Sequence, residues 1–578
     1  MPRFISCVAL AAVLGSGTFS YADELPSQFW VGLSQTVIDP NYDALADCKR
    51  DCSSPERIKS LQFWNNRITG AAEASEVLEL TEHTQSASRF LMQTTFGATA
   101  QAINELAQAI ASKGETEAFS QWLDSQVAVP ASHLQDLVSN TTDHLQASAW
   151  WHQSLTAPDQ LRQRIAFALN HVLTISLTGG LTKDGTLAEY YDLLAKNGLG
   201  NFRTLLDDVT YSIGMGIYLD NIQNRAAIKG KHPNENYARE LMQLFTIGTE
   251  YLALDGSPLH DKNGHVIPTY NEVDVAELAK ALTGLARGGS WFGRLNMKNK
   301  FHEKGDKTLF VGTPQETVIR YGADTGNGDV KQALDAIFNH PNVGPFIAKR
   351  LIQHFVTSNP EPAYVESVAR VFNDNGSGVR GDMKAVMKAV LLDDHARDPV
   401  KTSEFGKLKE PVLRLTNLLR AFKVDPVKQT AGQLSAIQKP LYAETVFSFF
   451  QPEDAPAGAI QEQGKVAPEF TLATDINLAV LHNAFTKNIL ELGLTRKEKR
   501  KGFYNRLMLD NESKLAVSDP SALLDRYDLL LMGGSMDVAM KQRILDFVNN
   551  ISIDDGGYER ARKALYLVMA SAQQAVQK

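Results

Sequence analysis

The segment from residue 232 to residue 248 constrains the fold most, because it combines a helical apolar stripe with a high density of charged and amide side chains. The stripe consists of Tyr237, Leu241, Leu244 and Phe245. These residues recur at the spacing of one helix face, and Gly248 supplies a stop. Glu235 and Arg239 are four residues apart and can pair, while Glu240 borders the stripe. The pattern predicts a short amphipathic helix that carries charge at the edge of a core.

Helical patterns of this kind recur along the chain, whereas strand patterns are short and scattered. Thr156 to Asp159 has the form of a capping box before a helix that continues to Leu173, and Asn271 with Asp274 opens another helix. Between about residues 288 and 328 the periodicity breaks, which predicts a loop with at most a small hairpin. The sequence therefore predicts a mainly α fold, a large helical domain with short irregular or small β-hairpin insertions.

The domain organisation that we expect has four segments within the 578 residues. They are a signal peptide at 1–22, an N-terminal extension at 23–84, a main helical domain at 85–485 and a C-terminal helical region at 486–578. The chain is long enough to bury a large core.

The first residues indicate export. A weakly basic start precedes an apolar run from about residue 4 to residue 18, and Ser20-Tyr21-Ala22 offers a small-x-small cleavage site before Asp23. The run is shorter than the roughly 20 residues of a membrane span, and no later uncharged segment reaches that length. A retained N-terminal anchor is the competing interpretation. We expect a periplasmic or secreted protein with no membrane span after cleavage.

Signal cleavage would leave two of the three cysteines, Cys48 and Cys52. An oxidising compartment favours a small-loop disulfide between them, with a redox role as the alternative to a structural one. The spacings of a four-cysteine zinc site and of covalent haem attachment are both absent from the sequence.

The formal net charge of −8 is mild. A nucleic-acid binder would need a basic stripe, and the most basic patch, at residues 496–501, is typical of a solvated helix face. We therefore expect no nucleic acid among the partners.

Several motifs occur in the same order as in a known family. They are SRFLMQTTFGAT at 88–99, RQRIAFALNH at 162–171, ENYARELMQLFTIG at 235–248, LTG at 282–284, FHEKGDKT at 301–308 and GPFIAKRLIQHF at 344–355. From about residue 85 onward the chain resembles the bacterial domain-of-unknown-function 1800 family. The resemblance implies a large, helix-rich exported protein, commonly encoded beside another exported protein that could be its partner, and it implies no reaction. Leu285 and Glu303 stand where family members more often carry Trp and Asp.

The candidate site is a polar pocket walled by Tyr237 and Phe167. The residues that we expect to converge on it are His171, Glu235, Arg239, Glu240 and His302. Buried polar groups without a partner cost roughly 1 to 3 kcal/mol each, so such groups should find one another or a ligand. His171, Glu240 and His302 are the predicted ligands of a divalent metal ion, and the adjacent arginine is suited to an anionic substrate. A purely structural network is the alternative interpretation of the same residues.

Two classes of function remain open. The sequence has no Gly-x-Ser-x-Gly, no His-Glu-x-x-His, no phosphate loop and no dinucleotide fingerprint. The first class is an exported metal-dependent enzyme, a hydrolase or an oxidoreductase, with a His/Glu/Arg pocket. The second is a non-enzymatic helical binding or assembly factor that acts with another exported protein or a surface polymer.

Overall fold

The computed structural model describes residues 78–138, 144–179, 185–322, 325–397, 405–422, 437–490, 507 and 509–578. The predicted signal peptide, the cysteine pair Cys48 and Cys52, and the basic patch at 496–501 lie outside the described residues.

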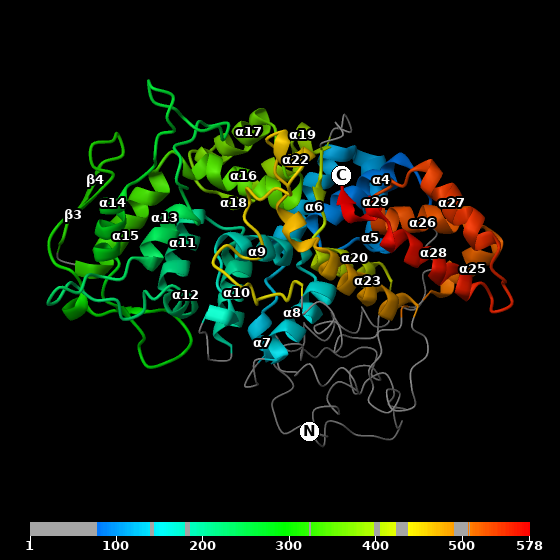
Figure 1. The fold of residues 1–578 in the computed structure, drawn as a ribbon, viewed down its shortest axis with the longest axis horizontal. Coiled ribbons are helices and arrows are strands. Elements are labelled where there is room, and N and C mark those ends of the chain that lie inside the picture. The colour runs from blue at the N-terminus through cyan, green and yellow to red at the C-terminus, as the bar shows by residue number, and fades with distance from the viewer. Residues whose placement is uncertain are drawn as a thin grey trace, which may run out of the picture.

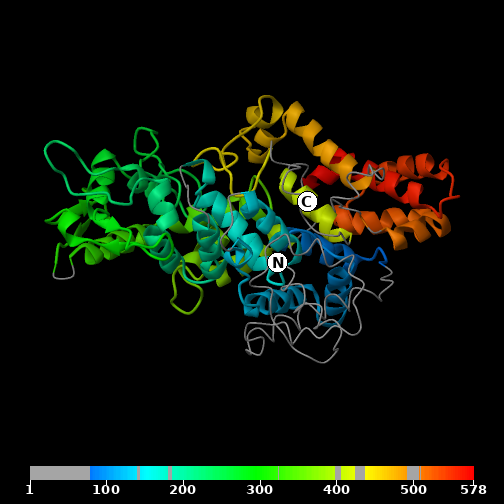
Figure 2. The same ribbon diagram turned by 90° about the horizontal axis from the view of Figure 1, so that it is seen from below.

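Helices dominate the described residues, which confirms the predicted mainly α fold. Strands in this part of the chain form three two-stranded antiparallel sheets, β1–β2, β3–β4 and β5–β6. The molecule is longer than it is wide, with α11 to α15 at one end and the C-terminal helices at the other (Figures 1 and 2). No helix among the described residues is both long and apolar enough to cross a bilayer.

The first end of the molecule holds helices and two small hairpins from residues 202 to 339. Its elements are α11 (Phe202–Tyr211), α12 (Ile213–Tyr218), α13 (Asn236–Gln243), α14 (Glu272–Ala281), β1 (Leu285–Ala286), β2 (Asn296–Met297), η4 (Asn299–Phe301), β3 (Lys307–Leu309), β4 (Thr317–Ile319) and α15 (Thr325–Asn339). The β3–β4 hairpin falls inside the stretch where the helical pattern breaks, as predicted.

The middle of the molecule brings together helices from both halves of the sequence. Its elements are α7 (Leu134–Val138), α8 (His144–Thr156), α9 (Gln160–Val172), η3 (Leu177–Gly179), α10 (Thr186–Asn197), α16 (Val343–Phe355), α17 (Pro362–Asn373), α18 (Met383–Leu392), α19 (Asp394–Arg397), β5 (Lys407–Leu408), α20 (Pro411–Ala421), α22 (Ala459–Glu462) and η5 (Pro468–Leu472). Every residue of α9 except Arg162 is buried, so this helix runs through the core and carries its polar side chains with it.

The second end combines the start of the described chain with its last helices. Its elements are α4 (Glu82–Thr94), α5 (Ala100–Lys113), α6 (Glu115–Ala128), α23 (Asp475–Ile489), α25 (Asp510–Ser518), α26 (Pro520–Met532), α27 (Val538–Asn549), α28 (Tyr558–Ala570), α29 (Ala572–Ala575) and β6 (Val576–Gln577). Ser88 in α4 donates a hydrogen bond to the carbonyl of Leu529 in α26. Strand β6 pairs with β5, so the last residues reach the middle of the molecule.

Local signals at two helix starts had different outcomes. Asn271 and Asp274 form the predicted capping box of α14. The predicted box at Thr156 is wrong, because α8 continues through Thr156 and its hydroxyl donates to the carbonyl of His152. Asp159 precedes α9 without capping it, and its carboxylate instead accepts hydrogen bonds from Ser132 and Gln163.

Candidate metal centre

Three ligand-type side chains meet in the middle of the molecule, each from a different helix end. They are His171 in the last turn of α9, His354 near the end of α16, and Glu410 at the start of α20. Their ligand atoms all lie within 4.8 Å of one another, and no other group of three His, Cys, Asp or Glu in the described chain meets this condition. Nε2 of His171 is 3.8 Å from Oε2 of Glu410, and the two imidazole centroids are 5.2 Å apart.

The three side chains are almost completely buried. The side chain of His171 is 3% exposed and that of Glu410 is fully covered. Both ring nitrogens of His171 and Oε1 of Glu410 have no hydrogen-bond partner among the described residues. A buried polar atom left unpaired costs about 1 to 3 kcal/mol, so these atoms point to a ligand that they hold together.

The carboxylate of Glu410 is held in place by Gln438. The side-chain amide of Gln438 donates to Oε2 of Glu410, and its carbonyl oxygen accepts the backbone N–H of Val412 at 3.1 Å. Pro411 follows Glu410 at the first position of α20, where a missing N–H has no cost. Partners of this kind orient the ligands of metal sites.

Two buried cationic side chains bind the backbone carbonyl of His354. Nη2 of Arg164 donates to the carbonyl of His354 at 3.0 Å, and Nζ of Lys407 donates to the same oxygen at 3.2 Å. Lys407 also forms an ion pair of 2.8 Å with Glu469. The end of α16 presents carbonyl groups and partial negative charge, which both cations stabilise.

Burial and these cations set the charge of the imidazoles. Burial lowers the pKa of His171 to about 4, with Arg164 and Lys407 acting in the same direction and Glu410 opposing them. The pKa of His354 is lowered well below its ordinary value, chiefly by burial and then by His171, Lys407 and Arg164. Both rings are therefore neutral near pH 7, and neutral imidazole is the form that binds a metal.

A cavity of about 400 Å³ opens beside the cluster. Its lining includes His171, His354, Arg350, Gln353, Glu469 and Phe450. The rings of Phe449 and Phe450 lie 5.7 and 5.6 Å from the ring of His171, so aromatic side chains cover one side of the cluster. Three protein ligands next to open space form the arrangement of a catalytic metal site, in which at least one coordination position is left for water or substrate.

The donor set fits a first-row transition metal ion. Two imidazoles and one carboxylate suit zinc and also the non-haem iron of the two-histidine, one-carboxylate type. Bonds of roughly 2 Å place tetrahedral ligand atoms about 3.3 Å apart. The separation of 3.8 Å between His171 and Glu410 is close to that value, and all three ligand atoms lie within 4.8 Å of one another.

Of the residues predicted for the site, His171 lies in this cluster and Phe167 packs against its ring at 4.6 Å. Tyr237 lies in the core, where its hydroxyl bonds to that of Thr210 at 2.7 Å, and it does not line the cavity. Phe167 does not line the cavity either, and it meets the cluster through its contact with the ring of His171.

Glu235 and Arg239 form the predicted pair along α13, at 3.3 Å. The guanidinium of Arg239 also binds both oxygens of Glu272, at 2.9 and 2.8 Å, at the partly exposed surface. Arg239 therefore links α13 to α14. Its two best donors are occupied by a carboxylate of the chain itself, which leaves it poorly suited to hold an anionic substrate.

Glu240 is half-buried on α13, and burial raises its pKa against the opposing effect of Arg239. Its Oε2 has no hydrogen-bond partner among the described residues, and it forms no ion pair there. Glu240 does not belong to the three-residue cluster.

His302 lies in a separate buried network at the α14 and α15 end of the molecule. Its Nε2 is 3.0 Å from Oδ2 of Asp329, and its Nδ1 faces Thr283. The structure does not bring His171, Glu240 and His302 together in one cluster: His302 binds Thr283 and Asp329, and of the three only His171 belongs to the group of close ligand residues. A catalytic role for the predicted residues stays a prediction.

Sequence reasoning missed His354 and Glu410. His354 sits beside the apolar stripe of α16, as His171 does in α9, and Glu410 occupies the position before a proline that begins a helix. The available signal for a site was a histidine beside the apolar face of each of two buried helices, α9 and α16. Nothing in the spacing of these residues showed that the two helix ends meet.

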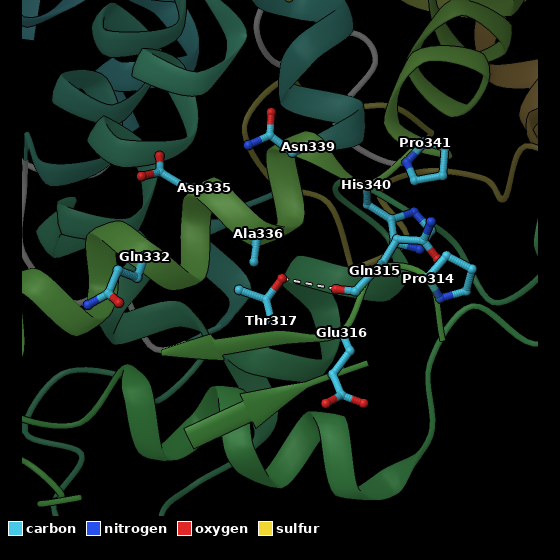
Figure 3. Close-up of a pocket in the computed structure, with 10 residues that line it drawn as sticks. All are labelled: Pro314, Gln315, Glu316, Thr317, Gln332, Asp335, Ala336, Asn339, His340 and Pro341. Carbon is cyan, nitrogen blue, oxygen red and sulfur yellow. Dashed lines mark hydrogen bonds between the residues drawn. The ribbon is translucent and has the colours of Figure 1, made fainter. Parts of the chain in front are cut away.

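A second hollow lies on the outside of the β3–β4 hairpin, with a volume of about 450 Å³ (Figure 3). Pro314 to Thr317 line it from the hairpin, and Asp335, Asn339 and His340 line it from α15 and the residues after it. Burial lowers the pKa of His340 to about 4, and its Nδ1 accepts the backbone N–H of Asn342. This histidine is occupied by its own chain, so the hollow offers no cluster of available ligands.

Comparison with known proteins gives one match. The sequence model of a family described as a protein of unknown function, DUF1800, matches residues 89–575. No curated protein and no solved structure matches the chain.

Proposed function

We propose that this chain, which belongs to the DUF1800 family, is a metal-dependent enzyme that acts outside the cytoplasm. Its ligands would be His171, His354 and Glu410, around one divalent first-row transition metal ion. The observation that carries the proposal is a buried group of three ligand residues beside a cavity, in which His171 and Glu410 have ligand atoms without a hydrogen-bond partner among the described residues. The apolar run and cleavage motif at residues 1–22 support export.

Hydrolysis is the reaction class that the surrounding residues favour. A bound ion of this kind polarises a substrate oxygen and activates water. Glu469 lines the cavity as a carboxylate paired with Lys407, and so provides a group that accepts a proton from water. Gln438 orients Glu410, while burial, reinforced by Arg164 and Lys407, keeps the imidazoles neutral.

The cavity walls indicate how a substrate would be held. Phe346, Phe447 and Phe450 offer apolar surface, and Gln243, Gln353 and Gln451 add amide groups to it. Arg350 lines the same cavity and pairs with Glu453 at 2.8 Å. Mixed aromatic and amide walls suit a substrate with both apolar faces and hydrogen-bonding groups.

The test is the metal content of purified mature protein. We expect one ion per chain in the wild type and none in Glu410→Gln, with helical content unchanged by circular dichroism. His340→Gln is the matched control, because His340 is another buried histidine of low pKa and lies outside the cluster. Zinc would support hydrolysis, and iron or copper would support the oxidoreductase alternative.

Wild-type protein that stays free of metal after incubation with zinc, iron(II) and manganese(II) would overturn the proposal. If such protein instead co-purified stoichiometrically with another exported protein, the binding or assembly factor would be the better description. In that case the cluster would be a structural network with enclosed water.

A further inference from the structure

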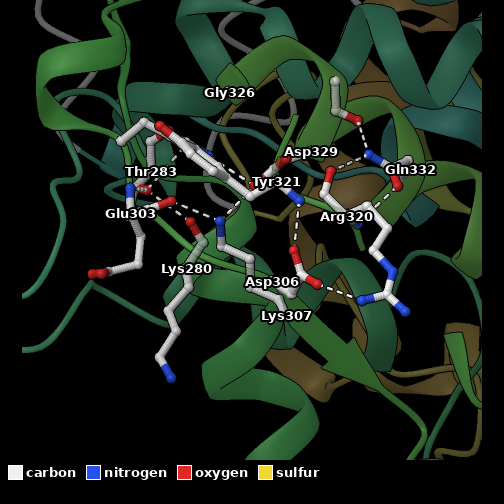
Figure 4. A network of polar contacts seen from close by, with 12 residues as sticks. Lys280, Thr283, Glu303, Asp306, Lys307, Arg320, Tyr321, Gly326, Asp329 and Gln332 are labelled. Atoms are coloured by element: carbon white, nitrogen blue, oxygen red, sulfur yellow. Dashed lines mark hydrogen bonds and ion pairs between the residues drawn. The ribbon is translucent and has the colours of Figure 1, made fainter. Parts of the chain in front are cut away.

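A lysine and an aspartate are buried against each other where the β3–β4 hairpin meets α15. Nζ of Lys307 lies 2.5 Å from Oδ2 of Asp329, and Nε2 of His302 lies 3.0 Å from the same oxygen. The side chains of Lys307 and His302 are each 1% exposed, and that of Asp329 is fully covered. Figure 4 shows Lys307 and Asp329 together, with Thr283 and Tyr321 close to them.

Hydrogen bonds fix where the protons of His302 lie. The hydroxyl of Thr283 donates to the carbonyl of Lys280 at 2.7 Å, so both oxygens of Thr283 act as acceptors toward His302. They lie 2.9 and 3.2 Å from Nδ1 of His302, which must therefore carry a proton. Nε2 then faces Asp329 with a single proton between them, held either by the imidazole or by the carboxyl group.

The network is closed off from water. The side chains of Lys307, His302 and Asp329 are at most 1% exposed. A net charge on groups buried in this way is costly. The ring of Tyr321 covers the site, 5.2 Å from Nζ of Lys307 and stacked 6.2 Å from the ring of His302.

The carboxyl group of Asp329 is engaged through one of its two oxygens. Its Oδ2 is engaged by Lys307 and His302, whereas its Oδ1 is buried and has no hydrogen-bond partner among the described residues. The amine of Lys307 thus lies beside a carboxyl group that an imidazole can protonate, in a site without competing solvent. These are the requirements for condensation of an amine with a carboxyl group. Because the fold already holds the two groups together, their reaction carries no entropy cost for bringing them together.

We propose that Lys307 and Asp329 join through an intramolecular amide bond that the folded chain forms by itself. In the proposed step Lys307 reacts as the neutral amine, and the lone pair of Nζ attacks Cγ of the protonated carboxyl group and forms the C–N bond. His302 passes a proton from the nitrogen to Oδ2, the C–O bond breaks, and one water molecule leaves. Amine and carboxylic acid become amide and water, with no oxidant, reductant or nucleotide, and His302 returns to its starting state.

The bond would fasten the hairpin insertion to the helical body. It connects β3 to α15 and closes the loop from residue 307 to residue 329, which includes β4. All cysteines of the chain lie at residues 7, 48 and 52, so no disulfide can fasten this region. The proposal is independent of the metal centre, since it shares no residue with it.

Mass spectrometry of the purified full chain tests the bond directly. We expect a mass lower by one water molecule than that of the mature sequence. Trypsin does not cut after an acylated lysine, so residues 305–320 should appear joined to residues 321–331 through Lys307 and Asp329. Lys307→Arg keeps the positive charge, cannot form the amide, and should restore the full mass.

Two ion pairs of the same chain are internal controls. Lys541 and Asp525 lie 2.5 Å apart, but their side chains are about a quarter exposed. Lys407 and Glu469 are buried and 2.8 Å apart, but Lys407 also donates to the carbonyl of His354. Neither pair should be joined. An unmodified mass with cleavage after Lys307 would overturn the proposal. A mass lower by one water together with tryptic cleavage after Lys307 would also overturn it, because the dehydration would then lie elsewhere in the chain.

Discussion

Removing the imidazole of His171 should weaken the acid sensitivity of the fold. His171 ordinarily titrates near 6.5, and in the folded protein its pKa is about 4. Between these values the unfolded chain binds a proton that the native chain does not. Stability therefore falls as the pH is lowered through this window, and it is fully present above about pH 6.5.

The magnitude follows from the size of the shift. One pKa unit corresponds to about 1.4 kcal/mol, so lowering the pH through the whole window reduces the free energy of unfolding by roughly 3 kcal/mol. Between pH 7 and pH 5 the reduction is about 2 kcal/mol. His171→Gln has no such proton to take up, so its free energy of unfolding should change by about 2 kcal/mol less than that of the wild type over the same interval.

The assay is urea unfolding at both pH values, in a chelator so that bound metal does not contribute. His265→Gln is the matched control, because it makes the same substitution at a side chain that is 80% exposed and lies outside the cluster. Equal pH dependence in wild type and His171→Gln would refute the reasoning, since it would mean that the imidazole takes up its proton equally in both states.

Three further substitutions test other contacts. Gln438→Leu removes the donor to Glu410 and should lower metal affinity by roughly 10- to 100-fold in a competition titration, with the melting temperature of the metal-free protein as a check on folding. Gly406→Ala should destabilise the protein by roughly 1 to 3 kcal/mol or more in urea unfolding, because its Cβ would lie 2.2 Å from the carbonyl oxygen of Gln577 and its φ is +113°. Asn271→Ala should cost about 1 kcal/mol by the same measurement, since it removes the cap of α14; an unchanged midpoint would contradict the capping role.

The predictable part of the fold was the part set by local chemistry. The spacing of Tyr237 and Leu241 identified α13, and Asn271 identified the start of α14, because a helix face and a cap involve residues a few positions apart. The cap assigned to Thr156 failed because the preceding helix continued through it, and no local pattern distinguishes a residue that starts a helix from one that ends another.

The candidate site was only partly predictable, since its members come from distant parts of the chain. His171 stood out as a polar residue at the margin of an apolar face. Its neighbours His354 and Glu410 depend on how α9, α16 and α20 pack, and side-chain spacing carries no information on that packing. The same limit explains Arg239, whose partner Glu272 belongs to another helix.

The β5–β6 pairing makes the order of synthesis matter for the metal centre. Gln577 donates to the carbonyl of Phe355, directly after His354, and the carbonyl of Ala575 accepts the backbone N–H of Lys409, directly before Glu410. Two of the three ligands are thus braced by residues that are synthesised, and cross any membrane, after all three ligands. A nascent chain halted before residue 575 would carry all three ligands and still lack the support that sets two of them. Loading with metal would then have to wait until synthesis has passed residue 577.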